Sequence, residues 1–131
     1  MDKNSEIPRG QGRGQGRRRQ VRRFLEPCLL LLIHQGESHG YQLQDELARF
    51  GFLPGRLDVS MVYRSLREME TQGWLESRWD DAGEGPRRRV YMLTEVGLKQ
   101  LHWSVEELKR TRRDIDGLLK AYASAGLDPA T

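Results

Sequence analysis

The feature that most constrains the fold is a set of apolar residues that repeats every 3.5 positions near the C-terminus. The set begins at Leu98 and ends at Tyr122, with spacings that alternate between three and four residues. This period is typical of a helix that packs along its length against another helix. We therefore predict one helix that is capped by Thr94 and ends near Ser124. Such a helix would be about 45 Å long, which is more than a small head can cover.

A second copy of the chain is the partner that this helix predicts. Hydrophobic residues make up 37% of the chain, below the roughly 45–50% of globular proteins, so a partner subunit would supply burial that one chain lacks. Arg112 occupies one position of the seam, where it would set the register or lie beside an acid. The predicted homodimer interface consists of Leu101, Val105, Leu108, Ile115, Leu119 and Tyr122.

Three shorter helices are expected before this long one. The first spans about residues 27–35, stops at Gly36, and has a possible extension back through Arg22. The second spans about residues 39–50 and is capped by Ser38. The third begins after a cap at Asp58 or Ser60 and continues to about Gln72, with Gly73 as the residue that ends it. Its predicted buried face consists of Val59, Val62, Leu66 and Met69.

The period then changes from helical to alternating. Residues 75–79 and 89–93 alternate in polarity, and the residues between them (DDAGEGP, 80–86) favour turns, so we predict a β-hairpin. Three helices followed by a hairpin wing are the layout of a winged helix-turn-helix, whose third helix enters the major groove of DNA. The predicted fold class is mainly α with a small β-hairpin, a winged helix-turn-helix plus a long C-terminal dimerisation helix.

Charge divides the chain into an arm and a body. Residues 1–23 carry a net charge of +6, whereas residues 24–131 carry −3. We expect four segments: an arm (1–23), a DNA-binding domain (24–94), a dimerisation helix (95–124) and a tail (125–131). The arm contains a Gly-rich repeat that is followed by Arg17, Arg18 and Arg19, and it would lie on nucleic-acid phosphates. The alternative is a solvated tail that only aids solubility.

Several classes of protein are excluded by what the sequence lacks. The single cysteine, Cys28, forms no internal disulfide and indicates a reducing compartment, so we expect a cytoplasmic protein that joins the nucleoid when it binds DNA. The longest apolar run in the sequence is far shorter than the roughly 20 residues that cross a bilayer. The three histidines lack metal-site spacing, and no catalytic or cofactor-binding motif is present. We expect no enzyme, no metal and no cofactor.

Candidate DNA contacts lie on the third helix and the wing. Arg64 and Arg67 would contact guanine or phosphate, unless they pair only with Glu68 or Glu70 within the helix. Ser60, Met61 and Ser65 are expected on the same exposed face. Alternation places Arg87 and Arg89 on one face of the wing and Arg88 on the other, with at least one on phosphate and at least one paired with an acid such as Glu70 or Glu76. Tyr41, near the start of the second helix, is a further candidate.

Three motifs together resemble the PadR family of transcriptional regulators, over about residues 24–122. They are HGY at 39–41 with Leu43, VYRSLREME at 62–70 with Gly73, and GPRRRVYMLTEVG at 85–97. The single C-terminal helix is similar to the family's short subtype, and the pattern is also similar to its polyhydroxybutyrate-responsive branch. The resemblance implies a dimeric repressor that responds to phenolic acids, drugs or other small apolar ligands. It also implies that Tyr63 contacts phosphate, whereas the alternative is a half-buried packing tyrosine.

One position departs from the family's pattern. Where the family often has Thr before the recognition-helix Tyr, this chain has Met61, which cannot hydrogen-bond phosphate but could touch a thymine methyl.

Trp103 and His102 would line a cavity for a small apolar or aromatic effector at the dimer interface. The alternative is that Trp103 packs on the first helix or the wing of its own subunit.

The predicted function is a homodimeric regulator that binds double-stranded DNA at an inverted repeat and acts as a ligand-responsive repressor. One rival is a sequence-independent or architectural nucleic-acid-binding protein dominated by the basic arm. Another is a winged-helix adaptor that binds proteins and not DNA. Deleting the arm would discriminate the first rival, and replacing Arg64 and Arg88 with Ala would discriminate the second.

Overall fold

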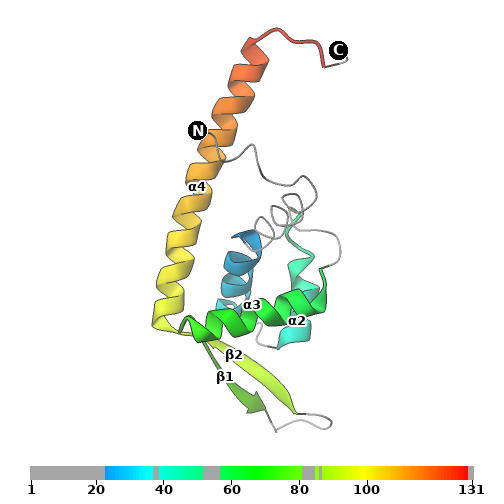
Figure 1. Cartoon of the computed structure of the whole chain (residues 1–131), viewed down its shortest axis with the longest axis vertical. Helices are drawn as coiled ribbons and strands as arrows, with labels where there is room; N and C mark the ends of the chain where they lie inside the picture. The colour runs from blue at the N-terminus through cyan, green and yellow to red at the C-terminus, as the bar shows by residue number, and fades with distance from the viewer. Residues whose placement is uncertain (1–22, 37–38, 52–56, 81–84, 86, 130–131) are drawn as a thin grey trace, which may run out of the picture.

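The computed structural model describes residues 23–36, 39–51, 57–80, 85 and 87–129. In this part of the chain, a helical head carries a hairpin at one end, and a long helix runs along the head and beyond it (Figure 1). The predicted fold class is confirmed. The predicted arm residues Arg17, Arg18 and Arg19 lie outside the described residues. The elements are a first helix (23–34), α2 (Gly40–Leu47), α3 (Val59–Thr71), β1 (Leu75–Asp80), β2 (Arg88–Leu93) and α4 (Glu95–Ser124).

The first helix forms the centre of the core. Leu25, Leu29 and Leu30 are completely buried, and the helix already includes Arg23, which the sequence assigns to the arm. The helix therefore begins before Pro27, as the alternative extension back toward Arg22 predicted, and not at Pro27. A proline inside a helix costs about 3 kcal/mol, but burying each leucine contributes about 1.5–3 kcal/mol, so burial on both sides of Pro27 outweighs the break.

The ends of α2 differ from the prediction. The cap residue is His39, not Ser38, and its backbone N–H donates to Gln42 Oε1 over 3.3 Å. The helix ends at Leu47, three residues earlier than predicted, because the chain tightens into hydrogen bonds that span three residues instead of four, such as Ala48 N to Asp45 O.

The α3 helix has the predicted ends. Asp58 caps it by accepting a 3.0 Å hydrogen bond from the backbone N–H of Ser60, and Gly73 follows it with a φ of +82°. Val59 is 42% exposed, so the prediction that it belongs to the buried face is wrong. It is the first residue of α3, and the buried face of the helix begins only at Val62.

The hairpin pairs Leu75 with Leu93 at its base and Asp80 with Arg88 near its tip. Thr94 fixes the base, because its backbone N–H donates to Trp74 O over 3.1 Å and its hydroxyl donates to Gly73 O over 2.6 Å. The same hydroxyl caps α4 by accepting from the backbone N–H of Gly97 over 3.0 Å. Thr94 therefore joins the wing to α4, and the predicted bounds of that helix are confirmed.

The apolar seam of α4 has two parts. Leu101 is only 7% exposed and belongs to the core of its own subunit, so its assignment to the dimer interface is wrong. The head covers the seam there, and α4 extends past the head (Figure 1). Further along the seam, Ile115, Leu119 and Tyr122 are exposed. No helix in the described residues is long and apolar enough to cross a membrane.

Candidate nucleic-acid interface

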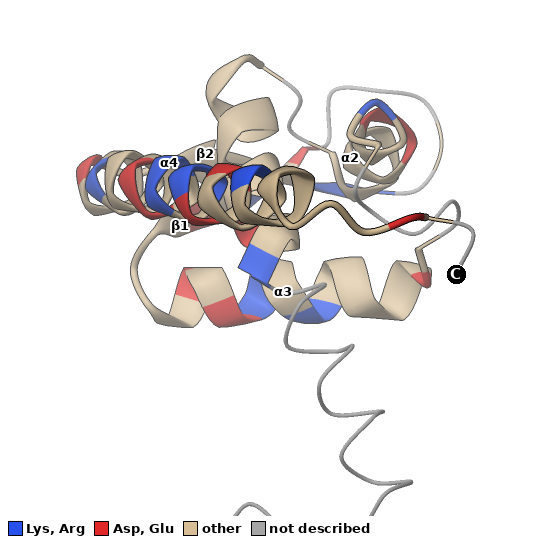
Figure 2. Cartoon of the chain, turned by 90° about the horizontal axis from the view of Figure 1, so that it is seen from above, with Lys and Arg blue, Asp and Glu red and all other residues tan. Residues whose placement is uncertain are grey.

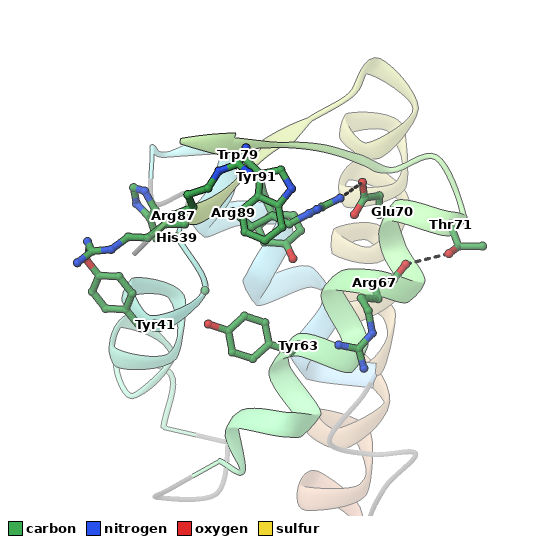
Figure 3. Close-up of a pocket in the computed structure, with 12 residues that line it drawn as sticks. His39, Tyr41, Tyr63, Arg67, Glu70, Thr71, Trp79, Arg87, Arg89 and Tyr91 are labelled. Atoms are coloured by element: carbon green, nitrogen blue, oxygen red, sulfur yellow. Dashed lines mark hydrogen bonds and ion pairs between the residues drawn. The ribbon is translucent and has the colours of Figure 1, made fainter. Parts of the chain in front are cut away.

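A cleft of about 730 Å³ lies between the start of α2, the exposed side of α3 and the wing (Figure 3). Four of its lining residues are arginines and most of the others are aromatic, a combination that suits a phosphate backbone. Among the described residues that line it, Glu70 is the only carboxylate. The cleft lining includes Gly40, Tyr41, Tyr63, Arg67, Glu70, Trp79, Arg87, Arg88 and Arg89.

The wing arginines are oriented by aromatic rings. The guanidinium carbons of Arg87 and Arg89 lie 5.2 and 5.1 Å from the centre of the Trp79 ring. Arg88 instead lies 4.9 Å from the centre of the Tyr41 ring and donates a hydrogen bond to its hydroxyl. This division follows the predicted alternation. Arg88 thus joins the wing to α2, whereas Trp79 aligns the other two side chains along the cleft.

Arg89 also contacts α3. Its Nη2 lies 3.7 Å from Glu70 Oε2, and its Nε donates a 2.8 Å hydrogen bond to Ser77 Oγ. The prediction that a wing arginine pairs with an acid is confirmed for this residue.

Tyr63 is half-buried and lies against α2, with its hydroxyl pointing toward that helix (Figure 3). A Cβ atom at Gly40 would lie only 2.5 Å from Tyr63 Cε1, so the close approach requires glycine. This is the packing position named as the alternative, but it also leaves Tyr63 in the cleft lining. The HGY motif at 39–41 contains Gly40, but the contact between Gly40 and Tyr63 was not predicted from the sequence.

His39 joins α2 to the tip side of the wing. Its Nδ1 lies 2.9 Å from Gln42 Oε1, and its Nε2 lies 3.6 Å from Asp80 Oδ2. The wing is therefore tied to α2 by the contact of Arg88 with Tyr41 and by the backbone bridge between His39 and Val90.

The outward face of α3 carries Ser60, Arg64 and Arg67, all exposed. Arg64 and Arg67 line a shallow groove of about 530 Å³ along the helix. Met61 is half-buried against the core. The prediction that Ser65 shares the exposed face is wrong, because Ser65 is 2% exposed. It lies three residues after Val62 and four before Met69, which places it on the buried stripe.

Charge is mixed elsewhere on the molecule. Basic and acidic residues are interspersed along α4 (Figure 2), and pairs such as Lys109 with Glu106 lie within one turn of each other. The hydrogen bond and charge of Lys109 lower the pKa of Glu106. In the cleft, by contrast, arginines from α3 and from the wing line the same surface.

The predicted effector residues are both exposed. Trp103, 60% exposed, lines a shallow pocket of about 250 Å³ together with Arg23, Glu107 and Leu108, but His102 does not line it. Arg23 Nη2 donates a 2.8 Å hydrogen bond to Thr111 Oγ1, which holds the first helix against α4 beside this pocket. In the described residues, no cluster of histidine, cysteine and carboxylate side chains could hold a metal ion.

These features define a winged helix-turn-helix protein of the kind that regulates transcription. The chain belongs to the transcriptional regulator PadR-like family, whose model matches residues 29–103, more than half of its length. This is a family of transcriptional regulators and not of enzymes.

Individual relatives agree with this assignment. The chain is 28% identical over 107 residues to the negative transcriptional regulator PadR of Bacillus subtilis, covering 76% of this chain and 56% of that protein. A crystal structure of a PadR-like transcriptional regulator from Bacillus cereus is 29% identical with a TM-score of 0.62, covering 72% of this chain and 90% of the other. Another, of a conserved protein described as a potential transcriptional factor, is 32% identical with a TM-score of 0.68, covering 78% and 90%.

Proposed function

We propose that the protein is a homodimeric repressor that binds an inverted-repeat DNA operator and responds to a small apolar or aromatic ligand. The observation that carries this proposal is the cleft, which is lined by Arg67 of α3 and by the arginines of the wing. A phosphate backbone would lie in that cleft while α3 enters the major groove beside it. Repression is also the activity named for the relative from Bacillus subtilis.

In this proposal the cleft side and the outward side of α3 have different tasks. Ser60 and Arg64 near the start of the helix would contact base edges, as the first turns of recognition helices do. Arg67, Arg88 and Tyr63 would contact phosphate and fix the position of the helix. Residues 24–94 would then form the DNA-binding domain, residues 1–23 a basic arm on the backbone, and residues 125–131 a tail. The protein would be cytoplasmic and nucleoid-associated when bound to DNA.

The proposed dimer uses the exposed part of α4. Ile115 is 51% and Leu119 58% exposed, and Tyr122 follows on the same stripe, so one chain alone leaves this apolar surface in water. A second α4 would cover it, and the symmetric pair of heads would match an inverted repeat. Residues 95–124 are therefore proposed as the dimerisation helix.

The proposed effector would bind beside Trp103. An aromatic ligand could stack on this exposed ring, next to Arg23 and Glu107 where the first helix meets α4. A ligand there would shift the protein between two arrangements of the heads if it binds one of them better. The polyhydroxybutyrate-responsive branch remains a prediction from resemblance.

Cleft binding is tested with Arg67→Ala and a matched control, Lys120→Ala, which removes an exposed cation near the far end of α4. Affinity for a short duplex is measured by fluorescence anisotropy at several salt concentrations. Arg67→Ala should lower the affinity and reduce the slope of log affinity against log salt by about 1, because one phosphate contact is lost. Lys120→Ala should leave both unchanged. Equal effects of the two variants would contradict the cleft.

Dimerisation is tested with Leu119→Lys against Ala121→Lys, which adds the same charge to an exposed residue on the other side of α4. Light scattering should give a dimer for the wild type and for Ala121→Lys, and a monomer for Leu119→Lys. A wild-type monomer, or a dimer for both variants, would contradict the interface.

The rivals are separated by two further variants. Deletion of residues 1–22 keeps Arg23 in the first helix, and it should reduce the salt dependence of DNA binding while preserving discrimination between operator and random DNA. Loss of all binding would favour the architectural protein. The double variant Arg64→Ala/Arg88→Ala should abolish repression, whereas full function without DNA binding would favour the adaptor.

A further inference from the structure

Glu70 is an acid in a cleft that we propose receives a polyanion. It lies near the end of α3, half-buried, and lines the cleft. Charge alone would make it unfavourable there, because a carboxylate repels phosphates that lie within a Debye length of about 8 Å at physiological salt. The contacts of Glu70 indicate what offsets this repulsion.

Glu70, Ser77 and Arg89 form a closed triangle of contacts. Ser77 Oγ donates a 2.6 Å hydrogen bond to Glu70 Oε2. The same hydroxyl accepts a 2.8 Å hydrogen bond from Arg89 Nε, and Arg89 Nη2 lies 3.7 Å from Glu70 Oε2. Each member thus contacts both of the others. We call this set the Glu70 triangle.

The Glu70 triangle joins three elements, α3, β1 and β2. Ser77 and Arg89 are not paired in the sheet register, since Ser77 lies opposite Tyr91 and Arg89 lies opposite Trp79. Arg89 lies two residues before Tyr91 on the same face of the hairpin, so Ser77 and Arg89 are diagonal neighbours that meet through their side chains. Between α3 and β1 only residues 72–74 intervene, so the triangle braces the wing against α3 just beyond this connection.

Arg89 is oriented by the Glu70 triangle and by Trp79 together. Its Nε and Nη2 face Ser77 and Glu70, while its guanidinium lies over the indole ring, 5.1 Å from the ring centre. Arg88, the next residue along β2, faces Tyr41 of α2 on the other side. The two arginines therefore brace the wing against both helices of the helix-turn-helix.

We propose that Glu70 is a positioning residue whose carboxylate increases the affinity for DNA, by fixing the angle between the wing and α3 through Ser77 and Arg89. This inference rests on the proposed function, because it concerns how DNA is bound. A wing at the wrong angle loses several phosphate contacts together, whereas removal of one partly exposed carboxylate relieves only a screened repulsion. The net effect of removing Glu70 is therefore weaker binding, opposite in sign to the effect of charge alone.

The experiment compares Glu70→Ala and Ser77→Ala with Glu76→Ala, a control that removes an exposed acid from the same strand outside the triangle. Each full-length variant is measured against a DNA site selected by the wild type, at several salt concentrations, and its melting temperature is recorded. Glu70→Ala and Ser77→Ala should each bind about 10-fold more weakly, the lower end of the range expected when a hydrogen bond to a charged group is lost. Their double variant should bind no more weakly than the weaker single one. Glu76→Ala should bind as the wild type does or slightly tighter.

Footprinting of the same complexes distinguishes positioning from a general loss of stability. In both triangle variants, DNA protection should be lost at the positions contacted by the wing and kept at those contacted by α3, with a lower salt slope because wing–phosphate contacts are lost, and with a folded protein at the assay temperature. Binding of Glu70→Ala that equals or exceeds the wild type would overturn the inference and leave the proposed function intact. Failure of the wild type to select any DNA would overturn the proposed function and this inference with it.

Discussion

Gly97 lies in the first turn of α4, where the helix crosses the connection that leads into the wing. A Cβ atom at this position would lie 2.0 Å from Trp74 O and 2.7 Å from Leu93 Cδ1. The first of these neighbours is backbone, so it cannot rotate away. We predict that Gly97→Ala destabilises the protein by forcing α4 and the base of the wing apart.

The magnitude follows from the hydrogen bonds at the contact. An ordinary contact needs at least 3.4 Å, so α4 must retreat by 1.4 Å from Trp74 O (3.4 less 2.0). The same oxygen accepts from Thr94 N over 3.1 Å, and the backbone N–H of Gly97 itself donates to Thr94 Oγ1 over 3.0 Å; such a retreat breaks both bonds. Two hydrogen bonds and the lost packing cost about 3–4 kcal/mol. Alanine returns about 1 kcal/mol of helix propensity, which leaves a net loss of about 2–3 kcal/mol.

Gly117 in the same helix is the matched control, since a Cβ there would meet nothing within 4 Å. Gly117→Ala should stabilise the protein by about 0.5–1 kcal/mol through helix propensity alone. Thermal melts followed by circular dichroism should show a fall of about 10–20 °C for Gly97→Ala and a small rise for Gly117→Ala. Equal melting temperatures for the two variants would refute the packing of α4 against Trp74.

The remaining predictions concern a thiol, a close approach and a helix cap. Burial raises the pKa of Cys28 to about 12, so the thiol should react with a thiol reagent only on unfolding, and stability should fall as the pH rises above the pKa of the unfolded thiol toward 12. Gly40→Ala should displace the Tyr63 ring and cost more free energy of DNA binding than free energy of unfolding. The DNA affinity and the melting temperature of this one variant are measured to compare the two. The backbone N–H of Ser60 lowers the pKa of Asp58. Asp58→Ala should therefore destabilise the protein at neutral pH, with a difference from wild type that vanishes in acid melts as the pH falls through the lowered pKa. A constant difference would contradict the cap.

Short stretches of sequence were sufficient to predict α3, α4 and the wing. The 3.5-residue period and Thr94 define α4, and the turn residues with two alternating runs define the wing. Asp58 and Gly73 mark the two ends of α3 as capping rules predict. Two starts for the first helix, at Pro27 or back toward Arg22, were possible from the sequence, because a proline rule is local, whereas the burial that overrides it around Pro27 depends on packing with distant residues.

The candidate site was predictable only in part, because side-chain partners depend on tertiary geometry. A one-residue step along α3 moves a side chain by about 100°, and this is why Ser65 falls on the buried stripe although Arg64 is exposed. Leu101 continues the seam in sequence, but the head of its own subunit covers it. The contact between Glu70 and Ser77 has no sequence signal, since it requires the angle between α3 and the hairpin.

Selection of bound sites from a random pool of DNA duplexes tests the central proposal most directly. A homodimer that places one α3 in each of two major grooves should enrich an inverted repeat whose half-sites are about one helical turn apart, or a multiple of it. The variant Leu119→Lys should lose this repeat and retain at most weak binding to half-sites. Recovery of unrelated sequences, bound with an affinity that depends on salt and not on sequence, would contradict the proposal.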